Sequence, residues 1–205
     1  MNFLEEKILA EGSIRPGNIL RMDSFLNHQI DIKLTSQLAY ELKRRFDGAE
    51  VTKILTIEAS GIAIATMLGY LYNVPVVFAK KAETVNCTDD KYVAQAYSFT
   101  HKEMNNVMVS RPYLHATDKV LIVDDVLADG QAALALIDLV HQAGGEVVGV
   151  GIAVEKGLQK GGRLLREMGY HVESVAIVKE MDSETQSIKF HGHPMMQMAA
   201  KDGNK

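Results

Sequence analysis

Apolar residues along the chain fall into two patterns, short continuous runs and longer stretches with helical spacing. Runs rich in β-branched residues at 51–57, 76–79 and 120–123 predict strands, and the last run indicates a fully buried one. Stretches with apolar residues three and four positions apart follow the first and the third run and predict helices. Strand, helix and strand in succession predict right-handed parallel crossovers, and therefore an α/β fold.

The remaining periodic segments extend this pattern towards both ends of the chain. Apolar residues at helical spacing predict further helices at residues 1–11, 31–47 and 160–168. Short apolar runs predict further strands, the last of them at a sheet edge, at residues 104–109, 147–154, 172–178 and 187–190. The tail from 194 to 205 has no core pattern, and we expect it to be disordered.

Two segments follow neither period. Residues 23–29 are polar where a core element would be apolar, so they form either a loop that serves a pocket or a surface turn. Residues 80–98 form a long polar stretch with few large apolar side chains. Such a stretch inside a compact domain is either a functional loop or a disordered one, and a lid that closes over substrate is one such function.

The strand at 120–123 ends in two adjacent carboxylates, Asp124 and Asp125, and a turn at Gly130 then leads into a helical pattern. Open α/β folds bind ligands at the carboxyl ends of strands, and a helix N-terminus presents free N–H groups to an anion. Carboxylates for hydroxyls or a metal, beside an anion-binding turn, indicate a site for a phosphorylated sugar. The alternative is a plain turn in which aspartate only caps the helix. Because adjacent strand residues point to opposite faces, we expect one carboxylate to face the sugar squarely.

Composition narrows the class of protein. A chain of 205 residues is long enough for one domain with a small lobe attached, and its net charge of −4 does not favour a nucleic-acid partner. The first residues show no signal pattern, no apolar run reaches membrane-spanning length, and the single cysteine, Cys87, cannot form an internal disulfide. We therefore expect a cytoplasmic protein that does not bind membranes.

Five stretches, in this order and spacing, resemble the type I phosphoribosyltransferases: residues 22–29, 57–63, 74–81, 120–132 and 154–156. The fourth stretch resembles the motif that binds phosphoribosyl pyrophosphate (PRPP), and the set resembles the xanthine-using bacterial members from about residue 20 to residue 190. The resemblance implies an α/β type I phosphoribosyltransferase fold, with a central, mostly parallel sheet flanked by helices, a small hood lobe and a flexible lid loop. It also implies one domain over 1–193, in which about 1–33 and 156–193 form the hood and about 34–155 the core.

The resemblance also implies roles for individual residues. The acidic doublet would hold the ribose hydroxyls, directly or through Mg²⁺ carried by PRPP, and the catalytic residues would be Asp124, Asp125 and Asp129. Small residues, backbone amides and two lysines would bind the phosphate and pyrophosphate groups: Ala128, Asp129, Gly130, Gln131, Ala132, Ala59, Ser60, Gly61, Lys80 and Lys81. Xanthine would be held by Leu20, Asn27 and Lys156.

The turn after the acidic doublet departs from the common family sequence at two positions. Asp129 stands where threonine or asparagine is common, and Ala132 lacks the hydroxyl found at the end of many such loops. A carboxylate that faces a phosphate is unfavourable, so Asp129 either caps the helix and faces outward or acts near C1 of the ribose.

The activity implied by the resemblance is transfer of the 5-phosphoribosyl group from PRPP to N9 of xanthine, giving xanthosine monophosphate (XMP) and pyrophosphate in purine salvage. Guanine or hypoxanthine as the base is the nearest alternative. A PRPP-sensing regulator of the same fold is less favoured, because the segment before residue 20 is too short for a DNA-binding domain and the net charge is negative. A dinucleotide-binding fold is set aside, since no Gly-x-Gly-x-x-Gly follows the first strand. The resemblance further implies a homodimer whose other partners are small molecules only.

Overall fold

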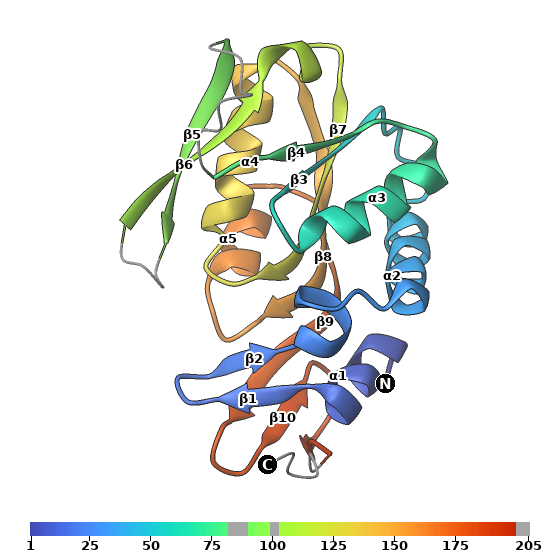
Figure 1. Ribbon diagram of the computed structural model, residues 1–205, viewed down its shortest axis with the longest axis vertical. Helices are drawn as coiled ribbons and strands as arrows, with labels where there is room; N and C mark the ends of the chain where they lie inside the picture. The colour runs from blue at the N-terminus through green and yellow to red at the C-terminus, as the bar shows by residue number, and fades with distance from the viewer. Residues whose placement is uncertain (82–89, 99–102, 200–205) are drawn as a thin grey trace.

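A seven-stranded sheet forms the centre of the molecule (Figure 1), and the computed structural model describes residues 1–81, 90–98 and 103–199. The strand order is β11-β10-β9-β8-β7-β3-β4. The ladders from β4 to β9 are parallel, while β10 and β11 are added antiparallel at one edge. The strand bounds are β3 Lys53–Ile57, β4 Val76–Ala79, β7 Lys119–Leu127, β8 Glu146–Lys156, β9 Val172–Asp182, β10 Ser187–Phe190 and β11 Met195–Gln197. The predicted α/β fold with a mostly parallel sheet is therefore confirmed.

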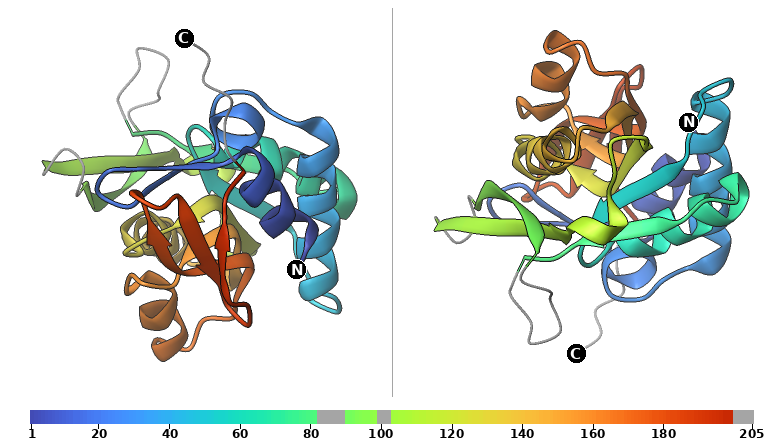
Figure 2. Two further views of the ribbon diagram at one scale, coloured as in Figure 1. Left: turned by 90° about the horizontal axis from the view of Figure 1, so that it is seen from below. Right: turned by 90° about the horizontal axis from the view of Figure 1, so that it is seen from above.

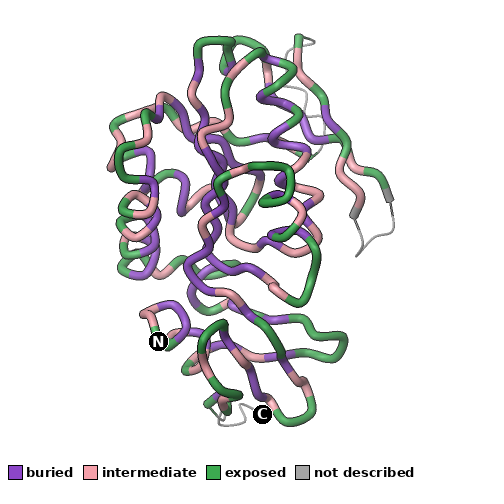
Figure 3. The backbone as a smooth tube through the Cα atoms, turned by 180° about the vertical axis from the view of Figure 1, so that it is seen from behind, coloured by how far each residue is buried: buried purple, intermediate pink, exposed green. Residues whose placement is uncertain are grey.

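Helices cover both faces of this sheet, α2 and α3 on one and α4 and α5 on the other (Figure 2). Their bounds are α2 Ile32–Arg45, α3 Gly61–Tyr72, α4 Gln131–Gln142 and α5 Gly161–Glu167. Alternate residues of β7 separate the two cores, because Leu121 and Val123 are buried with the first pair of helices and Val120 and Ile122 with the second. A strand covered on both faces needs apolar residues at successive positions, and this is why residues 120–123 form a continuous run. Figure 3 shows this buried backbone at the centre of the molecule.

A small lobe lies at the lower end of the molecule in Figure 1. It contains α1 Phe3–Glu11, the antiparallel pair β1 Ser13–Arg15 and β2 Ile19–Arg21, and a π-helical turn, Asp23–Asn27, beside β10 and the far end of β9. Helix α1 begins with a capping box, in which Asn2 accepts from the Glu5 amide and Glu5 accepts from the Asn2 amide. In the turn, Phe25 and Leu26 are fully buried, so the segment predicted as a polar loop also contributes to the core.

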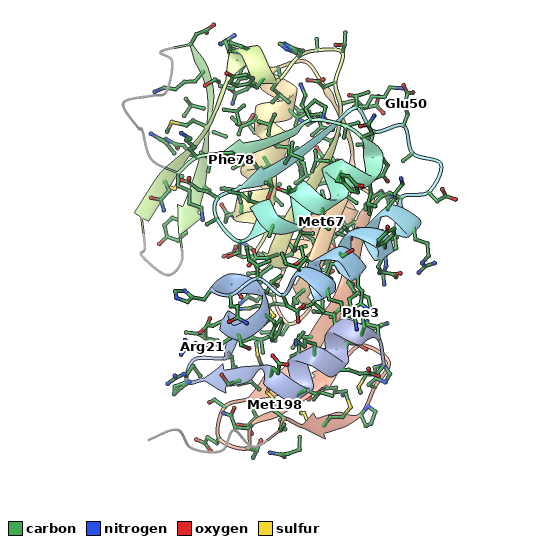
Figure 4. All side chains as sticks on the ribbon, turned by 45° about the vertical axis from the view of Figure 1, so that its right-hand side comes forward. Phe3, Arg21, Glu50, Met67, Phe78 and Met198 are labelled. Atoms are coloured by element: carbon green, nitrogen blue, oxygen red, sulfur yellow. The ribbon has the colours of Figure 1, made fainter. Side chains whose placement is uncertain are left out.

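The expected disordered tail is wrong for residues 195–199. Strand β11 pairs with β10, the Ala199 amide donates to the Leu9 carbonyl at 2.8 Å, and only 4% of Met198 is exposed. Figure 4 shows Met198 in the small lobe, beneath α1. Met196 and Met198 pack against the core, although the spacing of apolar residues in this segment follows neither helical nor strand periodicity. Residues 200–205 lie outside the described part of the chain.

The expectation of a loop throughout residues 80–98 is also wrong in part. Strand β5 (Lys91–Ser98) pairs along its whole length with β6 (Glu103–Ser110) in an antiparallel hairpin, and a short 3₁₀ helix, Arg111–Tyr113, follows. Ala94 and Val107 bury one face of the hairpin against α4, where the Gln142 amide donates to the Val93 carbonyl at 2.8 Å. The other expected lid residues, 82–89 with Cys87 among them, lie outside the described residues.

The described helices of the protein are short or polar compared with those that span membranes. Among the described residues, no helix is long and apolar enough to cross a bilayer.

Candidate active site

Three turns gather at one edge of the central sheet. Because β3, β7 and β8 run parallel, the turns that follow Ile57, Leu127 and Lys156 all lie at their carboxyl ends. Each of these turns leads into a helix, α3, α4 or α5. Helix N-termini present N–H groups without intrahelical acceptors and the positive end of the helix dipole, so this edge suits a ligand with several negative charges.

The larger of two cavities at this edge has a volume of about 840 Å³. The turn after β7 lines one side of it with Ala128, Asp129, Gln131 and Ala132. Positive charge comes from three lysines that also line it, Lys81, Lys156 and Lys160. The cavity therefore joins an amide-bearing turn with cations, which is a suitable environment for phosphate groups.

A smaller cavity of about 370 Å³ brings together Leu20, Asn27 and Lys156. These residues come from β2, the π-helical turn and the end of β8, which are far apart in the sequence. They are the three residues to which the resemblance assigns the base. Lys156 lines both cavities, so the two spaces meet at this side chain.

Asp124 is turned into the protein. Only 7% of the residue is exposed, and its Oδ1 accepts a hydrogen bond from the Asp125 amide at 2.9 Å. A side chain at Gly61 would collide with Thr56 and lie 2.9 Å from that same oxygen, so α3 can start here only with glycine. Burial, followed by the charge of Asp125, raises the pKa of Asp124 well above its ordinary value. The raised pKa favours the neutral carboxylic acid over the carboxylate.

Asp125 is held by Asn27, whose Nδ2 donates to its Oδ2 at 2.5 Å. Asp124 lies beside Gly61 and Asp125 beside Asn27, but a side-chain hydrogen bond also links the two carboxyl groups, so they do not point fully apart as expected. Neither carboxylate is among the residues that line the larger cavity. Asp125 reaches the smaller cavity through Asn27. Strand β7 continues past the doublet to Leu127, whereas a strand end at Val123 was predicted.

The turn between β7 and α4 depends on Gly130, which has a φ of +90° and precedes the first helical residue. This left-handed conformation favours glycine, and no side chain caps the helix start. Asp129 accepts only a long contact of 3.5 Å from the Gln131 amide and lines the larger cavity. Of the two alternatives for Asp129, the structure therefore favours a side chain at the cavity over one that caps the helix and faces outward.

The turn after β3 is joined to Lys81, the second of the two lysines after β4, by one hydrogen bond. The Lys81 amide donates to Oε1 of Glu58 at 2.6 Å. The positive charge of Lys81 opposes, without cancelling, the rise in the pKa of Asp124 that burial and Asp125 cause. Lys81 thus lies where the resemblance places a cation, at the larger cavity. Lys80 instead lines a separate cavity of about 490 Å³ beside β4, with Phe78 and Tyr113. Figure 4 shows Phe78 on that strand.

Lys156 is half-buried, and this burial lowers the pKa of its ammonium group, while the nearby charge of Asp129 opposes the shift. The next residue back, Glu155, is only 5% exposed and accepts hydrogen bonds from Arg166 at 2.8 and 2.9 Å. Two adjacent charged residues, which would normally be expected at the surface, are therefore a buried acid, Glu155, and a partly desolvated base, Lys156.

Sequence reasoning missed several residues at the larger cavity. Tyr97 and Asn105 come from facing strands of the hairpin β5–β6, and Gln159 and Lys160 follow β8. The short run Tyr92-Val93-Ala94 was the signal for β5, but the polar residues around it obscured it.

A metal site formed by the protein alone is not present in the described residues, since they contain no group of three or more His, Cys, Asp or Glu side chains placed to hold an ion. Mg²⁺ is commonly bound by one or two carboxylates together with substrate phosphates. The partly exposed Asp125 fits that second arrangement, whereas the buried Asp124, which favours the neutral acid, does not.

Comparison with known proteins identifies the family. The family model described as "Phosphoribosyl transferase domain" matches residues 21–191. Xanthine phosphoribosyltransferase of Lachnoclostridium phytofermentans is 49% identical over 192 residues, which cover 94% of this chain and 99% of that protein. Xanthine phosphoribosyltransferase 2 of Clostridium botulinum is 51% identical over 185 residues, covering 90% and 97%.

Solved structures confirm the fold. Adenine phosphoribosyltransferase from Thermoanaerobacter pseudethanolicus superposes with a TM-score of 0.72 at 22% identity, over 85% of this chain and 98% of that one. The family match and the similar relatives together show that the chain belongs to the phosphoribosyltransferase family, in the group whose members are named xanthine phosphoribosyltransferase.

Proposed function

We propose that the protein transfers the 5-phosphoribosyl group of PRPP to N9 of xanthine, releasing pyrophosphate and forming XMP. The observation that carries the proposal is the meeting of two cavities at Lys156. One is lined by the turn after β7, and the other is lined by Leu20 and Asn27. A transferase needs its donor and its acceptor side by side, and positioning of this kind can contribute on the order of 7–11 kcal/mol to catalysis.

Residues at the larger cavity would hold PRPP. The N–H groups at the start of α4 would bind the 5′-phosphate, and Lys81 would neutralise pyrophosphate together with the turn after β3. Asp125 is not among the residues that line the larger cavity, and its contact is with Asn27 of the smaller one. It would accept hydrogen bonds from the ribose hydroxyls between the two cavities, and the neighbouring Asp124 would fix its backbone. Mg²⁺ bound with PRPP would offset the charge of the leaving pyrophosphate.

The protein would also have to stabilise the positive charge that develops at C1 of the ribose. As the bond to pyrophosphate breaks, the ring gains positive character, and the Asp129 carboxylate at the same cavity would stabilise it. This gives a use to a carboxylate that would be unfavourable beside a phosphate. Lys80, which lines another cavity, would contribute to PRPP binding only through the long-range field of its charge.

Base selection would come from the smaller cavity. One N–H of the Asn27 amide is engaged by Asp125, which leaves the second to donate to the 2-oxo group of xanthine. The Lys156 ammonium would donate to the 6-oxo group, and Leu20 would contact the ring. Guanine carries an amine at position 2, so a donor facing that position would be left without an acceptor, and sites of this kind discriminate steeply.

The decisive test is turnover with a panel of bases. The protein is incubated with PRPP, Mg²⁺ and xanthine, guanine or hypoxanthine, and pyrophosphate release and the nucleotide product are measured. We expect xanthine to be the preferred base and XMP to be formed. Preference for guanine or hypoxanthine would establish the alternative substrate, and PRPP binding without turnover of any base would point to a regulator.

We further propose the organisation that goes with this function. Residues 1–33 and 156–193 would form a hood over the core of residues 34–155, in one domain over 1–193 that pairs into a homodimer in the cytoplasm. The support is the position of β1, β2 and β10 together at one end of the molecule (Figure 1). Sedimentation velocity would test the dimer.

A further inference from the structure

Glu155 anchors the end of β8, the strand that carries Lys156. Its carboxylate accepts two hydrogen bonds from Arg166 on α5, at 2.9 and 2.8 Å, and one from Ser174 Oγ on β9, at 2.6 Å. Two parallel N–H···O bonds fix orientation as well as distance. The anchor therefore ties together three elements, the strand with the base-facing lysine, its neighbour and the helix that follows.

The same anchor lies directly against the start of α5. A side chain at Gly162 would collide with the Glu155 carboxylate, and its Cβ would be 2.7 Å from Nη1 of Arg166. The bonds from Arg166 and Ser174 hold that carboxylate in place, so it cannot easily give way. Only glycine at this position allows the helix to pack on the ion pair.

The preceding glycine, Gly161, lies against the turn at residues 128–130, which is called the phosphate turn because it is proposed to bind the 5′-phosphate. The Gly161 amide donates to the Ala128 carbonyl at 3.0 Å, and a Cβ at Gly161 would be 2.5 Å from that oxygen and 2.6 Å from the Gly130 nitrogen. Gly130 in turn has no room on that side, since its own Cβ would meet the Gly161 Cα at 3.1 Å. The backbone at the start of α5 thus packs directly against the phosphate turn and supports it.

From these contacts we infer that the Glu155–Arg166 pair is a positioning device for both substrates: it fixes Lys156 at the base cavity and, through Gly162 and Gly161, the 128–130 turn at the phosphate cavity. Glu155 and Arg166 are positioning residues in this scheme. The inference rests on the proposed function, because it takes the two cavities as the sites of base and PRPP.

The arrangement has a kinetic consequence. A displacement near 1 Å at a reacting group can cost on the order of 100-fold in rate, so even a fraction of that shift in the turn and in Lys156 has a measurable effect. Loss of the anchor would move both sites together. Both KM values would then rise, whereas a change confined to one site raises one of them.

The test compares Glu155→Gln and Arg166→Met with a matched control, Arg45→Met. Arg45 is also a partly buried arginine in an ion pair, and it lines neither cavity. It donates at 2.7 Å to the main-chain carbonyl of Ser174, whereas the anchor uses the Ser174 hydroxyl, so Arg45→Met leaves the bonds to Glu155 in place. We expect KM for PRPP and KM for xanthine each to rise on the order of 10-fold in the first two variants. We expect Arg45→Met to lower Tm without changing either KM.

Arg166→Lys is a milder variant for the case in which Glu155→Gln or Arg166→Met fails to fold. It retains one ionic contact but not the bidentate pair, so both KM values should lie between those of wild type and Arg166→Met. Unchanged KM values in Glu155→Gln or Arg166→Lys, or an equal rise in Arg45→Met, would overturn the inference. If wild type fails to use xanthine, the proposed function fails instead. Calorimetric titration of wild type and Glu155→Gln with PRPP alone then decides whether the anchor still positions the turn.

Discussion

The two cavities at the edge of the sheet are built by different means. The larger one has a backbone turn along one side, residues 128–132, which contacts the start of α5 through Gly130 and Gly161. The smaller one is defined by side chains that the lobe and β8 contribute, Leu20, Asn27 and Lys156. Phosphate can be bound by main-chain amides, which every residue carries, whereas the functional groups of a base must be read by particular side chains. We therefore expect changes at the first cavity to affect turnover and changes at the second to affect selectivity.

The largest effect is expected for Asp125→Asn, which tests the boundary between the cavities. The asparagine would keep one acceptor oxygen but lose the negative charge and put an NH2 donor in place of the second oxygen, which weakens the bonds to the ribose hydroxyls and to Asn27, so kcat/KM for PRPP should fall on the order of 100-fold. Steady-state kinetics with varied PRPP would measure this, with the exposed Asp47→Asn as the control. Unchanged PRPP kinetics would remove Asp125 from its proposed role.

Asn27→Ala should affect base selectivity, because it removes the side chain proposed to bind the 2-oxo group of xanthine and leaves the turn at residues 128–130 intact. The ratio of kcat/KM for xanthine to that for guanine should fall roughly 10- to 100-fold, since the donor that rejects the guanine amine is lost. Competition between the two bases for limiting PRPP measures the ratio directly, and Gln37→Ala on the exposed face of α2 serves as control. An equal loss for both bases would mean that Asn27 only shapes the turn.

Lys156 predicts a pH dependence. Burial lowers its pKa from the usual 10.5, so the ammonium loses its proton, and with it a donor, at a lower pH than an exposed lysine would. Use of xanthine should decline as pH rises through this lowered pKa and be retained below it. Lys156→Arg should keep its charge and abolish that alkaline decline, at a cost in kcat/KM on the order of 10-fold from altered geometry. Identical profiles for the two proteins would show that another group is responsible.

The smallest effect is expected for Gln142→Ala, which loosens the hairpin beside the larger cavity. The Gln142 amide bonds both the carbonyl and the amide of Val93, at 2.8 and 3.3 Å, in an exposed position. Its loss should destabilise hairpin docking by about 0.5–1 kcal/mol. Faster hydrogen exchange at Val93 with a small rise in KM for PRPP would confirm this. Base selectivity should stay at the wild-type value, and a change in it would contradict the separation of the two cavities.

The centre of the parallel core could be predicted from the sequence because β3 and residues 120–123 of β7 are buried on both faces and form nearly continuous apolar runs. The elements at the margins could not. Strand β5 begins in a polar stretch and has no clear alternation of apolar and polar residues, while β11 is short and packs through methionines. The end of β7 was misplaced because two carboxylates normally stop a strand, yet here the ladder with β8 continues to Leu127.

The site was predictable to a different extent at each cavity. A strand, an acidic doublet, a glycine turn and a helix are local in sequence, so physical reasoning alone indicated a phosphate site there. Leu20, Asn27 and Lys156 are brought together by tertiary structure, and only the resemblance to a family grouped them. The Glu155–Arg166 anchor gave no sequence signal, because a glutamate before a lysine is usually solvated.

The single ammonium shared by both cavities has a thermodynamic consequence. A polyanion in one compartment favours the protonated form of Lys156, and that same form is the better donor to a carbonyl oxygen in the other. Binding free energies are reciprocal, so each ligand must tighten the other by the same factor. The two substrates would then assemble cooperatively, even though no segment of the chain has to move.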